Sequence, residues 1–327
     1  MFFIIIGVVL IFFASLLSIV FGSAGIPFSD AWNAFFAFDS TNMNHQIIWD
    51  LRLPRTLGDI LVGAAFAVAG GLMQGMTRNP LADSGILGIN AGAAFALALS
   101  LAFLPSMDQI TVVVCSFLGA AFSTMIVYGL TGFNHGKQSP IRLVLAGTAV
   151  NTLLAAISQA VALHFKVGQE VTFWTAGSVA GIRMEQILYV APFILLALIL
   201  AIFLSPSLSL LSLGEEAAKG LGLKVGKTKM LCMLAVLLLS GSAVSLAGPI
   251  AFVGLIIPHI VRKIVGVDYR NVLPCSAILG SLAMLVADVI SRLINIPRET
   301  PIGLVFAVIG VPFFLYISRK GKEEVHV

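Results

Sequence analysis

Long apolar runs separated by short polar connections dominate the chain. A helix that crosses the hydrocarbon core of a bilayer needs about 20 mostly apolar residues. The run with the weakest pattern is the eighth, because it holds two prolines, Pro249 and Pro258. We predict an all-α polytopic membrane protein, a single transmembrane domain over residues 1–327. Its ten transmembrane helices should lie at about 2–22, 56–76, 85–104, 110–131, 142–165, 187–205, 229–247, 250–266, 273–293 and 302–318.

The composition supports a membrane location. Hydrophobic residues make up 59% of the chain, charged residues only 10%, and the mean hydropathy is +1.04. Soluble domains carry about 25% charged residues, so soluble enzymes and nucleic-acid-binding proteins are excluded. The first run starts at Met1 with no basic residue before it, so we expect a retained span and not a cleaved signal peptide. Three cysteines within apolar runs indicate no disulfide framework: Cys115, Cys232 and Cys275.

The distribution of Lys and Arg predicts the orientation of the spans. With ten spans and a cytoplasmic N-terminus, six of the 19 cations fall outside: Arg52, Arg55, Lys166, Arg183, Arg292 and Arg298. The remaining 13 fall inside, which is the bias that the positive-inside rule describes. We therefore expect both termini in the cytoplasm.

An internal repeat is suggested by two similar segments, Gly63–Gly70 and Gly241–Gly248, which are offset by 178 residues (241 minus 63). The same offset aligns two further pairs, Pro80 with Pro258 and Gly88 with Gly266. Chance agreement between Gly- and Ala-rich helices is the alternative. The segments lie five spans apart, so their directions across the membrane are opposite. The second to fifth and seventh to tenth spans would then form inverted repeats, a plan common among transporters.

Two carboxylates within spans each have an arginine one helical turn away. Asp59 follows Arg55 at i+4, and Asp288 precedes Arg292 at i+4, so we expect local ion pairs. A proton relay is the alternative for an ionisable group in a membrane. The histidines His164 and His259 lack neighbouring ligands, so we predict no metal site.

The longest cytoplasmic connection, about 206–228, contains a segment with helix-forming residues between glycines. It includes Gly214, Glu215, Glu216, Ala217, Ala218, Gly220 and Gly222. Such a short helix is suited to docking on a soluble partner, and a solvated connector is the alternative. A phosphate loop is excluded, because Leu221 occupies the position of its first glycine and no strand precedes it. We expect no cofactor and no nucleotide on this chain.

Arginines on the outer side run against the general charge bias. Four of them lie at the mouths of predicted spans: Arg52, Arg55, Arg292 and Arg298. Guanidinium groups form bidentate pairs with carboxylates, so these arginines are candidates for docking an acidic partner or an anionic substrate. Interfacial snorkelling is the alternative.

Several short sequence motifs, spread along the chain, resemble the signature of permease subunits of iron–siderophore, haem and cobalamin ABC importers. They are Arg52-Leu53-Pro54-Arg55, Arg78-Asn79-Pro80-Leu81-Ala82, Ile86-Leu87-Gly88, Leu145-Ala146-Gly147, the segment 173–178, and the segment 248–259 from Gly248-Pro249 to Pro258-His259. The resemblance extends over nearly the whole chain. It is more specific for the family than for the substrate.

The resemblance implies a permease of the cytoplasmic membrane of a bacterium. It would dimerise, with a second copy or a paralogue, around a central pathway. It also implies two cytoplasmic ATP-binding subunits, which use ATP and Mg²⁺, and an extracytoplasmic binding protein that delivers the chelate. The segment Glu216–Gly222 is similar to the coupling motif of importers, although no I-x-L-P follows it. The four outer arginines would pair with glutamates of the binding protein. The inner gate would lie around Ser139 and Pro140.

The function expected from the sequence is therefore that of a non-enzymatic translocation subunit for an iron chelate, a siderophore. Haem or cobalamin is the alternative cargo. A proton-coupled secondary carrier and a channel are alternatives from other classes. The residues Arg78, Asn79, Pro80, Gly248, Pro249, Pro258 and His259 belong to structural motifs of the resemblance.

Overall fold

The computed structural model describes residues 2–21, 25–104, 106–131, 140–295 and 298–323, and the regular secondary structure of these residues is helical throughout. Each of the ten predicted spans corresponds to one helix. These helices are α1 (Phe2–Val20), α4 (Leu53–Thr77), α5 (Ile89–Phe103), α6 (Gln109–Thr131), α7 (Pro140–His164), α9 (Met184–Ser212), α11 (Val225–Ala247), α12 (Val253–Val265), α13 (Tyr269–Leu293) and α14 (Ile302–Glu323).

Short helices fill the connections. They are α2 (Phe28–Phe36), α3 (Met43–Ile47), a π-helical turn η1 (Ile48–Arg52), a 3₁₀ turn η2 (Ser84–Leu87), α8 (Gly168–Thr175) and α10 (Glu215–Gly220). The helices α3, η1 and α4 continue into one another, so Met43–Thr77 is a single helical rod of 35 residues. At 1.5 Å per residue this rod is about 52 Å long, which exceeds the hydrocarbon thickness of about 30 Å. One end of it must therefore extend out of the membrane.

Seven helices in the described part of the chain are long and apolar enough to span a bilayer, and α5 and the apolar part of α14 are shorter. The eighth predicted span is the least regular, as the prolines suggested. Its helix α12 has only 13 residues and follows an irregular segment in which Gly248 and Phe252 have φ angles of 70° and 71°. The helix is interrupted here because Pro249 has no backbone N–H to donate. Gly248 before it and Phe252 after it have positive φ angles, which a right-handed helix does not allow.

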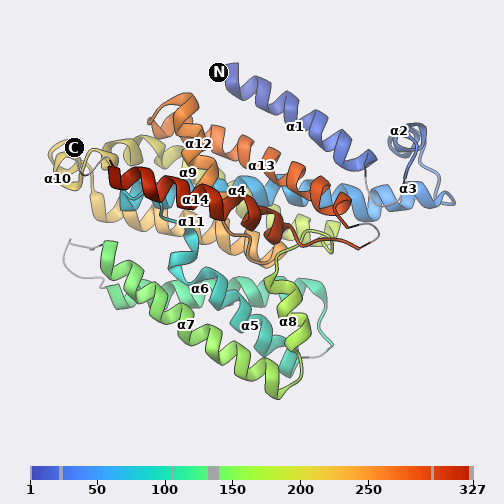
Figure 1. The fold of residues 1–327 in the computed structure, drawn as a ribbon, viewed down its shortest axis with the longest axis horizontal. Coiled ribbons are helices and arrows are strands. Elements are labelled where there is room, and N and C mark those ends of the chain that lie inside the picture. The colour runs from blue at the N-terminus through green and yellow to red at the C-terminus, as the bar shows by residue number, and fades with distance from the viewer. Residues whose placement is uncertain (1, 22–24, 105, 132–139, 296–297, 324–327) are drawn as a thin grey trace.

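The helix α4 lies at the centre of the larger of two groups of helices. Figure 1 shows α1, α4, α9 and α11 to α14 on one side, and α5 to α8 on the other. Glycines allow α4 to approach its neighbours backbone to backbone: a Cβ on Gly63 would collide with the carbonyl of Gly280 in α13, and one on Gly70 with that of Gly254 in α12. Small residues at interfaces are what helix association in membranes requires.

The two halves of the chain pair their helices in equivalent ways. Contacts between α4 and α13 have their counterpart between α11 and α6, and those between α5 and α6 have theirs between α12 and α13. The fixed offset of 178 residues is nevertheless wrong as a structural register. Gly70 lies inside α4, whereas its supposed equivalent Gly248 follows the end of α11. The connections and helices of the two halves differ in length, so no single offset can align them.

The motif residues lie at helix ends and helix contacts. Arg78 caps α4 in the left-handed conformation (φ 52°), and the side chain of Asn79 accepts a hydrogen bond from the Leu81 N–H at 3.0 Å. Gly248 lies against the carbonyl of Trp174 with no room for a Cβ. In α12, the ring of His259 packs edge-on against that of Phe313 in α14, with 5.7 Å between ring centroids. Their placement agrees with structural roles.

Candidate functional site

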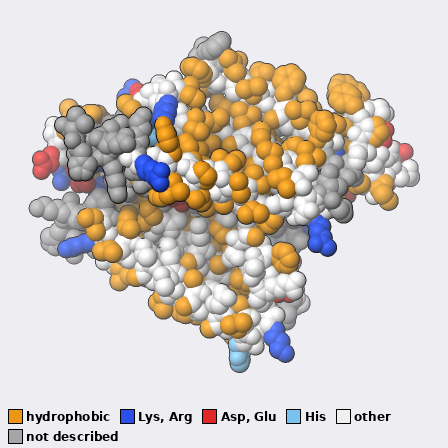
Figure 2. Space-filling model, viewed as in Figure 1, with side chains coloured by type: hydrophobic (Ala, Val, Ile, Leu, Met, Phe, Trp, Pro, Cys, Tyr) orange, Lys and Arg blue, Asp and Glu red, His pale blue; other side chains and the backbone are white. Residues whose placement is uncertain are grey.

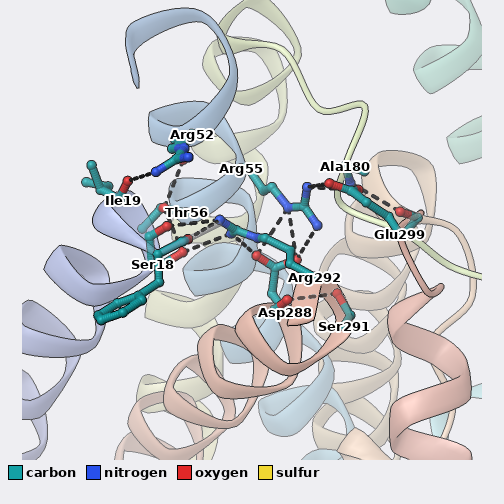
Figure 3. Close-up of polar contacts among 12 residues, drawn as sticks. Ser18, Ile19, Arg52, Arg55, Thr56, Ala180, Asp288, Ser291, Arg292 and Glu299 are labelled. Atoms are coloured by element: carbon teal, nitrogen blue, oxygen red, sulfur yellow. Dashed lines mark hydrogen bonds and ion pairs between the residues drawn. The ribbon is translucent and has the colours of Figure 1, made fainter. Parts of the chain in front are cut away.

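A buried network of arginines and carboxylates joins four segments near one end of the molecule (Figure 3). The Nε and Nη2 of Arg55, in α4, donate to Asp288 Oδ1 in α13 at 2.9 and 2.7 Å. Its Nη1 donates to Glu299 Oε1, in the connection before α14, at 2.8 Å. Arg292 forms an ion pair with the same Asp288, which is completely buried. Two carboxylates, Asp288 and Glu299, thus balance the charges of the two guanidinium groups, which is why this end of α4 and α13 tolerates charge inside the protein.

The end of α1 completes the network. Arg292 Nη1 donates to the Ser18 carbonyl at 2.9 Å, and Arg52 Nη1 donates to the carbonyls of Ile19 and Val20 at 2.6 and 2.8 Å. These carbonyls belong to the last turn of α1, where they have no partner within the helix and where the helix dipole favours a cation. The two arginines therefore anchor α1 to the bundle.

The structure confirms one of the two predicted local ion pairs and contradicts the other. Asp288 pairs with Arg292 as expected, but Arg55 forms its ion pairs with Asp288 and Glu299 and not with Asp59. Asp59 is completely buried, and neither of its carboxylate oxygens has a hydrogen-bond partner. Spacing along one helix places Asp59 within reach of Arg55, whereas two carboxylates from other segments offer that arginine more hydrogen bonds.

The candidate docking arginines are divided by their burial. Arg52, Arg55 and Arg292 are only 6%, 8% and 3% exposed, whereas Arg298 is exposed on the connection between α13 and α14. A partner's carboxylate can reach Arg298 directly. It can reach Arg55 only past Glu299, whose side chain is 36% exposed. The sequence did not single out Glu299, although it directly follows Arg298.

The helix predicted in the connection between the sixth and seventh spans is confirmed as α10, and the bounds of the connection differ from those expected. Because α9 extends to Ser212 and α11 starts at Val225, the connection covers 213–224 and not 206–228. Gly214 and Gly222 flank the helix with φ angles of 118° and 84°. The amides of Gly222 and Leu223 donate to the carbonyls of Lys219 and Ala218, which is the Schellman pattern that ends a helix at glycine.

The two glutamates of α10 have different environments. Glu215 Oε1 accepts a hydrogen bond from Lys229 Nζ in α11 at 2.5 Å, and Lys229 is buried. Glu216 and Ala217 are exposed, while Ala218 is completely buried against the bundle. The helix is therefore fixed to α11 through one side and presents Glu216 on the other.

The helix α7 presents an exposed face that the sequence analysis missed. Thr148, Thr152 and Gln159 are exposed on it at spacings of four and seven residues, together with several alanines. The hydroxyls of Thr148 and Thr152 donate to the carbonyls of Val144 and Thr148 within the helix, so the amide of Gln159 is the polar group of this stripe that most favours a protein or aqueous neighbour. This spacing is visible in the sequence and could have served as the signal. Of the candidate gate, Ser139 lies outside the described residues, and Pro140 is the first residue of α7.

Among the described residues no group of three His, Cys, Asp or Glu side chains is placed to hold a metal ion. His164 packs against the ring of Phe165, with centroids 4.9 Å apart, and is far along the chain from His259. The three cysteines are free thiols.

Comparisons with known proteins agree on the kind of molecule. The sequence model of the FecCD transport family matches residues 9–320. The iron(3+)-hydroxamate import system permease protein FhuB of Bacillus subtilis is 47% identical over 97% of this chain and 83% of its own. The iron-uptake system permease protein FeuB of the same organism is 43% identical over 94% and 93%. A solved metal-chelate type ABC transporter in an inward-facing conformation is 28% identical, with a TM-score of 0.84 over 97% of this chain and 98% of that one.

Proposed function

Because the chain belongs to the FecCD transport family, we propose that it is the permease subunit that carries an iron(III)–hydroxamate siderophore into a bacterial cell. The observation that carries the proposal is its 47% identity, over nearly the full chain, to a permease for iron(3+)-hydroxamate. A large chelate needs a pathway between helices and no site for naked iron. The side-chain chemistry of the described residues suits such a cargo, since it offers small and apolar surfaces.

The chelate assignment is tested by uptake of radiolabelled iron in cells that lack the gene and receive it back on a plasmid. We expect uptake of an iron(III)–hydroxamate to return and unlabelled hydroxamate chelate to compete, while haem and cobalamin do not. If haem competed for uptake and the hydroxamate chelate did not, haem would be the cargo and the proposed hydroxamate would be wrong. If vesicles that contain this subunit alone accumulated the chelate against a gradient, the proposal that it is part of an ATP-driven importer would be wrong.

The remaining subunits follow from this function. Two ATP-binding subunits on the cytoplasmic side would hydrolyse ATP and contact α10, a binding protein outside would deliver the chelate, and a second permease would face the α7 stripe. Figure 1 has α10 and the C-terminal end of α14 at one end of the molecule, with α2 and α3 at the other. This supports an orientation with α10 and both termini in the cytoplasm of a cell with this protein in its cytoplasmic membrane. ATP binding would then push α10 and, through Lys229, tilt α11 against the other half.

Reversing the charge of Glu216 should uncouple the permease from its ATPase without unfolding it. We expect Glu216→Arg to lower siderophore uptake at least about tenfold, because it would place a cation where the partner meets a carboxylate (about 1.4 kcal/mol per tenfold change). The thermal midpoint should not change, since Glu216 is exposed. The measurements are uptake, ATPase co-purification and a thermal unfolding curve.

Glu215→Gln is the matched variant on the same helix. It removes the ion pair with the buried Lys229, so it should lower the thermal midpoint while the surface offered to the ATPase changes little. If Glu216→Arg left uptake and co-purification at the wild-type level, α10 would be a connector and not a coupling helix.

Reversing the charge of Arg298 should weaken docking of the binding protein. Arg298 is exposed, so Arg298→Glu should leave the fold intact and reduce the association rate, by about tenfold at low salt, as expected for a charge at the rim of an interface. The measurement is surface plasmon resonance of the purified transporter with its binding protein, at low and high salt. Lys166→Glu, another exposed outer cation, is the control. Equal effects of the two variants would indicate general attraction and remove Arg298 from the interface.

A further inference from the structure

The helix α2 carries a row of aromatic side chains that the described residues leave exposed. Phe28, Trp32 and Phe36 follow one another at i, i+4 and i+8, so they share one face of the helix. They are 65%, 57% and 73% exposed, and the rings of Trp32 and Phe36 stack with 4.6 Å between centroids. Large exposed apolar patches mark sites of interaction with a partner or a membrane.

The opposite face of α2 is fixed in a small core of its own. Ala31 and Ala34 pack with Ile19, Ile26 and Ile48 in a cluster separate from the main core of the bundle. Two hydrogen bonds tie the helix to the rod behind it: Trp49 Nε1 donates to the Ala34 carbonyl at 2.8 Å, and Asn44 Nδ2 donates to Asp30 Oδ2 at 2.7 Å. The aromatic face therefore points outward in a defined direction.

The position of α2 along the membrane normal follows from its contact with α1. Ile19 belongs to the last turn of α1, an almost wholly apolar helix of 19 residues, whose length of about 28 Å matches the hydrocarbon thickness of the bilayer. A helix that packs on this turn lies at the hydrocarbon edge. Figure 1 shows α2 nearly end-on while α1 and α4 run across the view, so α2 lies across the direction of the spans. Figure 2 shows hydrophobic side chains on this outlying part of the surface.

The charges around α2 narrow the choice of partner. Between 25 and 51 the chain has three acidic residues, Asp30, Asp39 and Asp50, and no Lys or Arg. Attraction to anionic surfaces, whether lipid or protein, is therefore excluded as the main force. Aromatic side chains at the hydrocarbon edge, on a helix parallel to the membrane plane, are the arrangement of interfacial anchors. The neighbouring helix α1 also exposes many large apolar side chains, as expected of a helix in lipid.

We propose that α2 is an interfacial anchor, with Phe28, Trp32 and Phe36 inserted into the headgroup and acyl boundary of the leaflet at the outer end of α1. The lipid bilayer is thus the partner of this surface. The anchor would hold the connection between α1 and α3 flat on the membrane, beside the arginine network. The proposal concerns lipid contact alone and does not depend on the cargo.

The experiment measures the lipid exposure of Trp32, one of three tryptophans in the chain. The full-length protein is placed in nanodiscs of phosphatidylcholine and phosphatidylglycerol (3:1), with or without phosphatidylcholine brominated near the headgroup end of the acyl chain. We expect brominated lipid to quench the tryptophan fluorescence, and Trp32→Phe to remove about a third or more of that quenching. Trp174→Phe, which changes a half-buried tryptophan of α8, is the matched control.

A second variant separates insertion from folding. Phe28→Ser with Phe36→Ser should keep the thermal midpoint, because both side chains are exposed, while Trp32 emission shifts to the red and becomes accessible to aqueous iodide. If iodide quenches Trp32 in the otherwise unchanged protein and brominated lipid does not, the face is open to water or to a protein partner. That result would overturn the proposal while leaving the transport function untouched.

Discussion

Replacing Asp288 with alanine should destabilise the protein by about 3–5 kcal/mol, the cost of removing one partner from a buried ion pair. Two guanidinium groups depend on this carboxylate, from Arg55 and Arg292, and all three side chains are less than 10% exposed. Their positive charges would remain buried, with that of Arg292 left without an ion-paired carboxylate among the described residues. The thermal midpoint in detergent should fall strongly, and the ends of α1, α4 and α13 should become open to proteolysis.

The controls for this prediction separate charge from volume. Asp50→Ala removes an exposed carboxylate from η1, the turn directly before Arg55 and α4, and should change the midpoint little. The triple variant Asp288→Ala, Arg55→Met, Arg292→Met removes the stranded charges together with the acid, so it should recover part of the loss. An Asp288→Ala protein as stable as the wild type would mean that the network does not hold these helices together.

Replacing Gly70 with valine should prevent the bundle from assembling. A Cβ at this position would meet the backbone of Gly254 in α12, which has no flexible side chain that can move aside. Overpacking in a well-packed interior already costs about 1–3 kcal/mol where side chains can adjust, and here two helices must separate. We expect little monodisperse protein after solubilisation and a much lower thermal midpoint.

Gly129→Val is the matched control, because Gly129 lies on an exposed face of α6 and its Cβ would meet nothing. The same substitution in a helix should leave yield and midpoint close to those of the wild type. A normal yield of Gly70→Val with an unchanged midpoint would show that the backbones of α4 and α12 are not in contact at Gly70 and Gly254.

Much of the fold follows from local patterns. Each apolar run became a helix, since a backbone in lipid has to satisfy its own hydrogen bonds. The irregular eighth span was signalled by Pro249 and Pro258, and α10 by the two glycines around it. Features of this kind depend on residues that are neighbours along the chain, so they are readable without knowledge of the packing.

The candidate site could be predicted only in part, because its residues are distant from one another along the chain. Arg52, Arg55 and Arg292 stood out as unusual cations, but the sequence predicted the wrong partner for Arg55 and did not indicate that all three are buried. Asp288 is 233 positions from Arg55, and Glu299 is 244 positions from it. Which carboxylate an arginine meets depends on how α4, α13 and the next connection pack.

The apolar runs were enough to predict the helices that span the membrane, because hydrophobicity and backbone hydrogen bonding act on each segment separately. The likeness to a transporter family was visible in short sequence motifs. The packing of the helices had to be known to see that Glu215 pairs with Lys229 while Glu216 is exposed, and that the aromatic face of α2 points outward. Burial and pairing depend on contacts between segments distant in sequence, and an amino-acid pattern does not specify those contacts until the helices are packed.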